Sequence, residues 1–175
     1  MWMTTLNKIR SHSPCEDGWK KLLKHLGKTK ADYEPLSIIE ILDSNGLDDA
    51  LWCLRAVDGH DREIRLYAVW CALQVQHPIA DQRNIEALDV AERYANGLAT
   101  DEQLAAARAA TRAAAQEAED AAADPAAWSI ARATADDAAW AAIVAAGDVA
   151  VAAALAYVLG AGRADQKDKL REVAG

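Results

Sequence analysis

The segment "DGHDREIR" at residues 58–65 contains the densest cluster of titratable side chains in the sequence. These side chains are Asp58, His60, Asp61, Arg62, Glu63 and Arg65. Carboxylates beside a histidine could transfer protons, and clustered arginines could bind a phosphate. The alternative is the start of a helix, where Asp61 accepts hydrogen bonds from first-turn amides and pairs with Arg65 one turn later. We favour this structural interpretation, because catalytic groups need a pocket and the sequence shows none.

The sequence lacks the common motifs for metal binding, phosphate binding and nucleophilic catalysis. The four histidines, His12, His25, His60 and His77, form no HxH, HExxH or Cys/His metal spacing. Neither a glycine-rich phosphate loop nor a GxSxG motif occurs. The three cysteines include no CxxC, which argues against a disulfide framework and fits a reducing compartment. We therefore expect no catalytic residues, no metal and no cofactor.

Apolar spacing predicts helices along the whole chain, and no strand pattern is recognised. The clearest helix has Ser13 as its expected N-cap, Pro14 at its first position and Glu16 as the capping-box partner. Its apolar face repeats at i, i+3, i+4 and i+7 through Trp19, Leu22, Leu23 and Leu26. The expected helical segments are 13–28, 34–46, 47–57, 61–75, 82–96, 101–124, 128–134, 136–160 and 163–175, the last of them frayed.

The helix that begins near Asp61 is expected to be the central helix of the N-terminal half. It has two apolar stripes, one made of Ile64, Tyr67, Ala68, Cys71 and Val75, the other of Leu66, Val69, Trp70 and Leu73. A helix that is apolar on two sides is buried between neighbours. In the following helix the expected inward residues are Ile85, Leu88, Ala91 and Ala95.

The composition changes near residue 98, where alanine replaces Leu, Ile and Trp as the main apolar residue. Thr100 and Gln103 form a capping box before an alanine-rich helix of high intrinsic propensity. Pro125 follows Asp124 and is expected to restart a helix. We predict an all-α bundle of about seven to nine helices in a single domain, 1–175. Residues 1–97 form a Leu/Trp-rich half, and residues 98–175 form an alanine-rich layer.

The formal net charge of −8 is unevenly distributed. Residues 1–31 carry +5 and the remainder carries −13. The lysine-rich face of residues 13–28 could bind phosphates, but we favour a solvated helix face and expect no direct nucleic-acid binding. An acidic stretch follows later, with Glu117, Glu119, Asp120, Asp124, Asp136 and Asp137. These carboxylates could enter a cationic groove of a nucleic-acid-handling enzyme, although solubility of an alanine-rich helix is the simpler explanation.

Two resemblances bear on the fold and function. The segment "HDREIRLYAVWCAL" resembles the second helix of a HEAT-type repeat, without a second copy at a fixed period. The segments "DDALWCLRAVDGHDREIRLYAVWCA" and "AERYANGLATDEQLAAARAA" resemble a family of immunity-protein-like phage and bacterial proteins, over about residues 47–125. That resemblance implies carriage on mobile elements and action by binding, with no catalytic residue to transfer.

These observations predict a non-catalytic binding protein, an immunity or anti-defence (for example anti-CRISPR) inhibitor that occupies the surface of a toxin or a nucleic-acid-targeting defence complex. The acidic residues above are the predicted partner-binding residues. One alternative is an enzyme with a dispersed active site in a pocket near Asp61 and Arg65. Another is a structural protein that self-assembles into a homo-oligomer through alanine faces. We expect no membrane span, because the longest apolar run has 13 residues and a span needs roughly 20. We expect a cytoplasmic protein, because the N-terminus lacks the apolar middle segment of a signal peptide.

Overall fold

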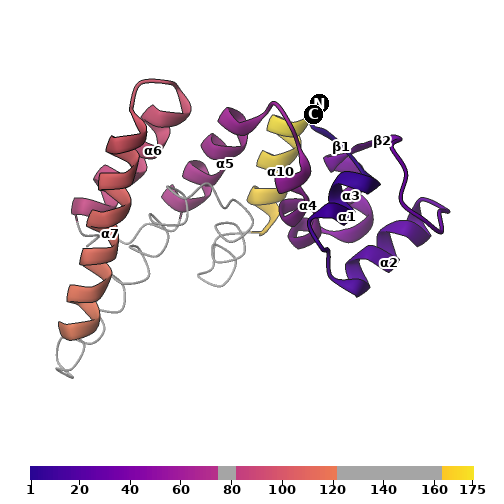
Figure 1. The fold of residues 1–175 in the computed structure, drawn as a ribbon, viewed down its shortest axis with the longest axis horizontal. Helices are drawn as coiled ribbons and strands as arrows, with labels where there is room; N and C mark the ends of the chain where they lie inside the picture. Colours follow the sequence, from indigo (N-terminus) through magenta and orange to yellow (C-terminus); the bar gives the residue numbers. More distant parts are fainter. Residues whose placement is uncertain (75–81, 122–162) are drawn as a thin grey trace.

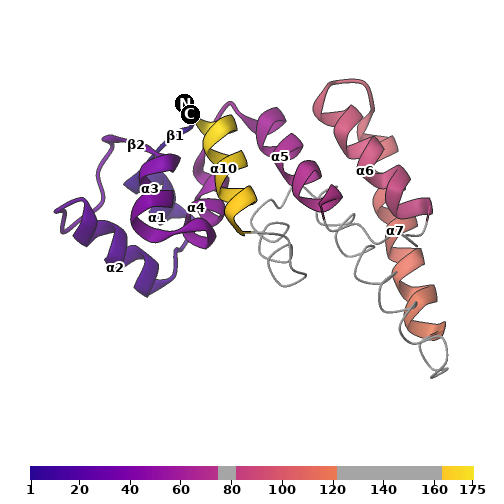
Figure 2. The same ribbon diagram turned by 180° about the vertical axis from the view of Figure 1, so that it is seen from behind.

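The computed structural model describes residues 1–74, 82–121 and 163–175, which are mostly helical, as predicted. Figures 1 and 2 show the helices arranged in a row, with α2 (Glu16–His25) at one end and α7 (Asp101–Ala121) at the other. Between them lie α1 (Leu6–Ser11), α3 (Ile38–Asn45), α4 (Leu47–Cys53), α5 (Asp61–Leu73), α6 (Gln82–Ala95) and α10 (Arg163–Ala174). The short 3-10 helix η1 (Leu54–Ala56) follows α4 directly. The predicted helices of residues 128–134 and 136–160 lie outside the described residues.

The all-α fold class is confirmed, and a small two-stranded sheet that the sequence did not indicate accompanies the helices. Strands β1 (Met3–Thr5) and β2 (Pro35–Ser37) pair antiparallel, with Thr4 opposite Leu36. Each strand is followed at once by a helix, and its last residue is the N-cap. The Thr5 and Ser37 hydroxyls accept hydrogen bonds from the amides of Lys8 and Ile39, each over 3.2 Å. Strands of three residues are too short for a period-2 pattern to be recognised in the sequence.

The core of the N-terminal half lies where the sheet meets α1, α3 and α4. Its most buried large side chains are no more than 1% exposed: Trp2, Ile9, Ile38, Ile41 and Leu51. They are of the Leu, Ile and Trp types that dominate the apolar composition before residue 98, although Trp2 and Ile9 precede the first helix predicted from the sequence. Removing them from water is the main favourable term that holds these short helices together.

Helix α10 is packed into the fold, so the prediction of a frayed last helix is wrong. Its Leu170 and Ala174 side chains are 0% exposed, and it contacts α5 and α3. The Tyr67 hydroxyl donates a hydrogen bond to the Gln166 carbonyl over 3.1 Å. The Trp2 amide donates to the Ala174 carbonyl over 2.8 Å, which brings the two chain ends together in Figure 1. The C-terminal helix therefore closes the core built by the N-terminal segments.

Helix α5 has one fully buried face and one that is only partly covered. Ile64, Tyr67 and Cys71 are buried, as predicted for the first stripe. In the second stripe Trp70 is half-buried and Leu73 is 47% exposed, so full burial on two sides is wrong there. The predicted Val75 lies outside the described residues.

Helix α6 presents a different inward face from the one predicted. Ile85 is 41% exposed, whereas Asn84, Ala87, Leu88 and Ala91 are buried. The inward stripe is rotated towards small side chains, because α6 contacts both α5 and α7 and close helix approach favours small residues. The prediction for Leu88 and Ala91 is confirmed, and the prediction for Ile85 is wrong.

Of the two capping boxes predicted from the sequence, one is confirmed and one is wrong. The Gln103 amide donates to the Thr100 hydroxyl over 3.3 Å and the Thr100 amide donates to the Gln103 side chain over 2.9 Å, which confirms that capping box. Ser13, by contrast, has a positive φ of 57°, and α2 begins at Glu16 after Cys15. The capping box predicted for Ser13 is therefore wrong, because the backbone there turns away from the helix.

Candidate functional site

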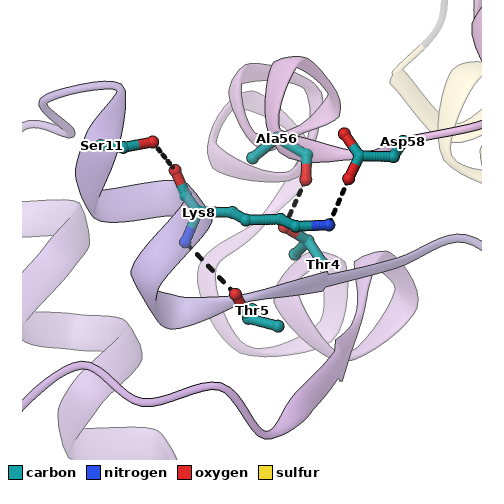
Figure 3. Close-up of polar contacts among 6 residues, drawn as sticks. All are labelled: Thr4, Thr5, Lys8, Ser11, Ala56 and Asp58. Carbon is teal, nitrogen blue, oxygen red and sulfur yellow. Dashed lines mark hydrogen bonds and ion pairs between the residues drawn. The ribbon is translucent and has the colours of Figure 1, made fainter.

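The charged segment at residues 58–65, where α5 begins, and the residues just before it contact β1 and α1. Figure 3 shows Asp58 in an ion pair with Lys8 of α1, and the buried Thr4 hydroxyl donating to the Ala56 carbonyl over 2.6 Å. The Lys8 amide donates in turn to the Thr5 hydroxyl. These contacts hold the chain between η1 and α5 against β1 and α1. They support the structural interpretation of Asp58.

Among the remaining charged groups of this segment, the Glu63 carboxylate lies 3.7 Å from His60 Nδ1 and 3.8 Å from the Arg62 guanidinium. Arg62 and Arg65 also contact residues at or just after the end of α6. His60, and not Asp61, is the N-cap residue of α5, so the predicted cap is one residue off and has no side-chain hydrogen bond. The Arg62 guanidinium donates to the Asn96 side chain over 2.7 Å. The Arg65 guanidinium lies over the Tyr94 ring, 4.9 Å from its centroid. Burial lowers the pKa of Arg65, and the charge of Asp61 partly offsets that effect.

A groove of about 460 Å³ lies along the side of α5, where the enzyme alternative requires a pocket. Its polar lining consists of Arg62, Glu63, Glu92 and Lys169, and the rest is mostly apolar. Arg62 is held by Asn96 and the Lys169 ammonium is held by Glu172 over 2.9 Å. Four titratable side chains thus line the groove, and two of them are engaged by side chains outside it. The enzyme alternative stays a prediction.

The predicted partner-binding carboxylates are only partly within the described residues. Glu117 is exposed on α7, and the Arg83 guanidinium of α6 binds it with two hydrogen bonds of 3.0 and 2.7 Å. Asp120 is also exposed and accepts a hydrogen bond from Gln116. Glu119 lies on α7, but its side chain is outside the described part of the structure, as are Asp124, Asp136 and Asp137. Whether the six act together stays a prediction.

The basic N-terminal face is largely compensated by local partners. Lys20 pairs with Glu16, Lys28 pairs with Asp32 and Glu34, and the Lys21 ammonium donates to the Asn45 carbonyl. Hydrogen bonds to Asp32 and Glu34 raise the pKa of Lys28. This arrangement supports the interpretation of the lysine face as a solvated helix surface.

A second cavity, between α2 and α4, brings together residues that the sequence gave no reason to combine. It has a volume of about 280 Å³. Its lining residues include Trp19 and Trp52, the acidic residues Asp48 and Asp49, and the cysteines Cys15 and Cys53. Its apolar lining consists of Ile9, Pro14, Leu22, Ile41 and Leu51. In the sequence Trp19 lies on the apolar face of its helix, and Asp48 and Asp49 follow the start of another helix, where carboxylates interact favourably with the positive end of the helix dipole. Neither pattern indicates that these residues share a cavity.

The carboxylate of Asp49 is held in place at the edge of this cavity. The Asn45 side-chain amide donates to Asp49 Oδ2 over 2.7 Å and to the Gly18 carbonyl over 2.9 Å. Gly18 allows this close approach, because a Cβ there would lie 2.8 Å from Asp49 Oδ2 and 3.0 Å from Cys15 Sγ. The glycine therefore fixes how near α2 comes to the start of α4.

The two buried cysteines are poorly suited to nucleophilic chemistry. Burial raises the pKa of Cys53 and that of Cys71 to about 12, so both thiols stay protonated near neutral pH. Cys15 is exposed. Within residues 1–74, 82–121 and 163–175, no three His, Cys, Asp or Glu side chains are grouped closely enough to hold a metal ion. In the same ranges no helix combines the length and apolar character needed to cross a bilayer.

No family model, curated protein or solved structure matches this chain. The resemblance of residues 47–125 to immunity-protein-like sequences and the HEAT-like character of α5 therefore stay predictions.

Proposed function

We propose that this chain is a non-catalytic binding protein, encoded by a phage or mobile element, that inhibits a partner protein in the cytoplasm by occupying its surface. The partner is either a toxin, which makes the chain an immunity protein, or a nucleic-acid-targeting defence complex. The observation that carries the proposal is the acidic surface of α6 and α7. In residues 82–121 there are eight carboxylates against four arginines.

The exposure of these carboxylates favours a surface that meets a cationic partner. Seven of the eight are exposed in the described structure: Glu86, Asp89, Glu92, Asp101, Glu102, Glu117 and Asp120. Leu98, in the turn between the two helices, is 69% exposed and supplies an apolar group beside them. A rigid helix pair with a charged border and an apolar contact point suits electrostatically steered binding to a basic groove.

The rigidity of the helix pair supports the same proposal. The Tyr94 hydroxyl donates to the Asp101 carboxylate over 2.7 Å across the turn, and Arg83 binds Glu117 near the other end. A surface fixed in this way loses little conformational entropy on binding. This consideration favours the α6–α7 pair over the basic face of α2, where local partners already compensate several lysines.

The test compares two variants of equal charge change in a bacterial host that carries nucleic-acid-targeting defence systems. In the first, Glu86→Gln, Asp89→Asn and Asp120→Asn neutralise the α6–α7 surface. In the control, Asp17→Asn, Asp165→Asn and Glu172→Gln neutralise exposed carboxylates on α2 and α10. The wild type and the control should co-purify a stoichiometric partner and protect against its activity.

The α6–α7 variant should bind that partner at least about tenfold more weakly, and binding of the wild type should fall with salt. A toxin as partner would support the immunity version, and a defence complex would support the anti-defence version. Equal binding by the two variants, or no stoichiometric partner in hosts that carry either system, would contradict the proposal.

A further inference from the structure

We propose that the cavity between α2 and α4 binds an organic cation, with the cationic group on the Asp49 carboxylate and the apolar body against Trp19 and Trp52. The ligand class is a guanidinium or ammonium group on a short apolar chain. It can come from a free small molecule or from an arginine or lysine side chain of a protein. This site is separate from the α6–α7 surface and does not rest on the function proposed for it.

The charged residues of the lining favour a positively charged ligand over a negatively charged one. Asp48 and Asp49 line the cavity, and no Lys, Arg or His is among the described lining residues. An anionic ligand such as a phosphate would find like charge there and no donor side chain of opposite charge. A cation would find the half-buried Asp49 carboxylate beside a mostly apolar lining, where an ionic hydrogen bond is stronger than in open water.

Asp49 is already oriented for such a ligand. Asn45 donates to one of its oxygens and thereby fixes the side chain. A carboxylate has about four acceptor positions, and Asn45 uses one of them. Among the described residues no cationic side chain forms an ion pair with Asp49, so its remaining acceptor positions can take the parallel N–H groups of a guanidinium.

The two indoles suit the rest of the ligand. Each already has a guanidinium nearby from the same chain: Arg10 lies 5.7 Å from the Trp19 ring centroid and Arg55 lies 4.5 Å from that of Trp52. Indole is the aromatic ring that attracts cations most strongly. The volume of about 280 Å³ lies near the lower end of ligand pockets, roughly 300 Å³, which suits a ligand of side-chain size.

The experiment uses the full chain and a matched pair of probes, butylguanidinium and N-butylurea, which have similar shape but differ in charge. Binding is followed by the indole N–H resonances in two-dimensional NMR, with Trp19 and Trp52 assigned from Trp19→Phe and Trp52→Phe. Butylguanidinium should shift these two resonances saturably. N-butylurea should bind at least about tenfold more weakly, because it makes no charge-assisted hydrogen bond.

Two variants and a control test whether the Asp49 carboxylate binds the cationic group of the ligand. Asp49→Asn keeps the acceptor for Asn45 but removes the charge, and it should weaken butylguanidinium binding about tenfold while leaving N-butylurea unchanged. Gly18→Ala should also weaken binding, because its Cβ displaces the Asp49 carboxylate. Asp17→Asn, an exposed carboxylate of α2 outside the cavity lining, should have no effect.

A third probe separates the two sources of the cation. A capped Gly-Arg-Gly peptide that binds more tightly than butylguanidinium would assign the site to a partner's side chain, and weaker binding would assign it to a free small cation. Equal binding of butylguanidinium and N-butylurea, no saturable shift at Trp19 and Trp52, or full affinity in Asp49→Asn would overturn the proposal. None of these results depends on the α6–α7 surface.

Discussion

Replacing Leu170 by alanine should strongly destabilise the whole protein, although this residue lies only five positions before Gly175. The Leu170 side chain is 0% exposed within α10, which packs against α5 and α3. Truncating a fully buried leucine removes its transfer free energy and leaves a cavity, at a total cost of about 3 kcal/mol within a usual range of roughly 2–5. Against a typical unfolding free energy of about 5–15 kcal/mol this is a large fraction.

The corresponding change in melting temperature is a decrease of roughly 6–12 °C, taking about 2–4 °C per kcal/mol for a chain of this size. Urea unfolding followed by tryptophan fluorescence gives the free energy directly. Leu170→Val should cost about 1 kcal/mol, because it removes one methylene. The control is Asp168→Ala, an exposed residue of the same helix, which should change stability by less than about 0.5 kcal/mol.

The reasoning fails if Leu170→Ala and Asp168→Ala have equal, small effects. That result would mean that α10 frays in solution, as the sequence alone suggested. It would also remove the basis for placing the two chain ends together. A large effect of Leu170→Ala with a small effect of Leu170→Val and none of Asp168→Ala would show that packing, and not helix propensity, holds α10 in place.

Two further predictions concern buried groups. Gln166 is 1% exposed, and within the described part of the chain neither of its side-chain polar atoms has a hydrogen-bond partner. Gln166→Leu should therefore raise the unfolding free energy measured with urea by about 1–3 kcal/mol, and Gln166→Glu should lower it. A loss of stability in Gln166→Leu would contradict this. In a thiol assay with an aromatic disulfide at pH 8, Cys15 should react quickly, and Cys53 and Cys71 only after denaturant is added. Burial raises the pKa of these two thiols from about 9 to about 12, so the unfolded chain loses their protons first, and the unfolding free energy should fall as pH rises through this window. The double variant Cys53→Ala/Cys71→Ala should show a smaller fall of the unfolding free energy with pH. An unchanged fall would contradict the raised pKa of the two thiols.

The charged segment at residues 58–65 illustrates how far sequence reasoning reached. Helix-terminal residue types and the following apolar period were sufficient to predict that a helix begins here, as α5 does at Asp61. The detailed partners were not predictable, because Asp58 binds Lys8 and Arg62 binds Asn96, residues that are distant in sequence. A local pattern reports which backbone conformation is favourable, but it does not report which surface will lie opposite a side chain.

The cavity between α2 and α4 likewise could not be predicted from local sequence patterns. Trp19 belongs to an apolar pattern, and Asp49 lies in the first turn of α4. Nothing local indicates that α2 and α4 meet at Gly18, because that contact depends on the absence of a Cβ and on the Asn45 side chain that bridges the two helices.

What the sequence by itself determined is the helical class, the buried face of α5, the capping box at Thr100 and the acidic character of the later helices. Each of these follows from interactions within one or two turns of the chain, whose free energies depend on residue type and spacing. Only the tertiary structure decided the β1–β2 pairing, the burial of α10 and the cavity between α2 and α4. These depend on contacts between distant segments, where burial of a few side chains such as Leu170 outweighs the polar character of the helix that carries them.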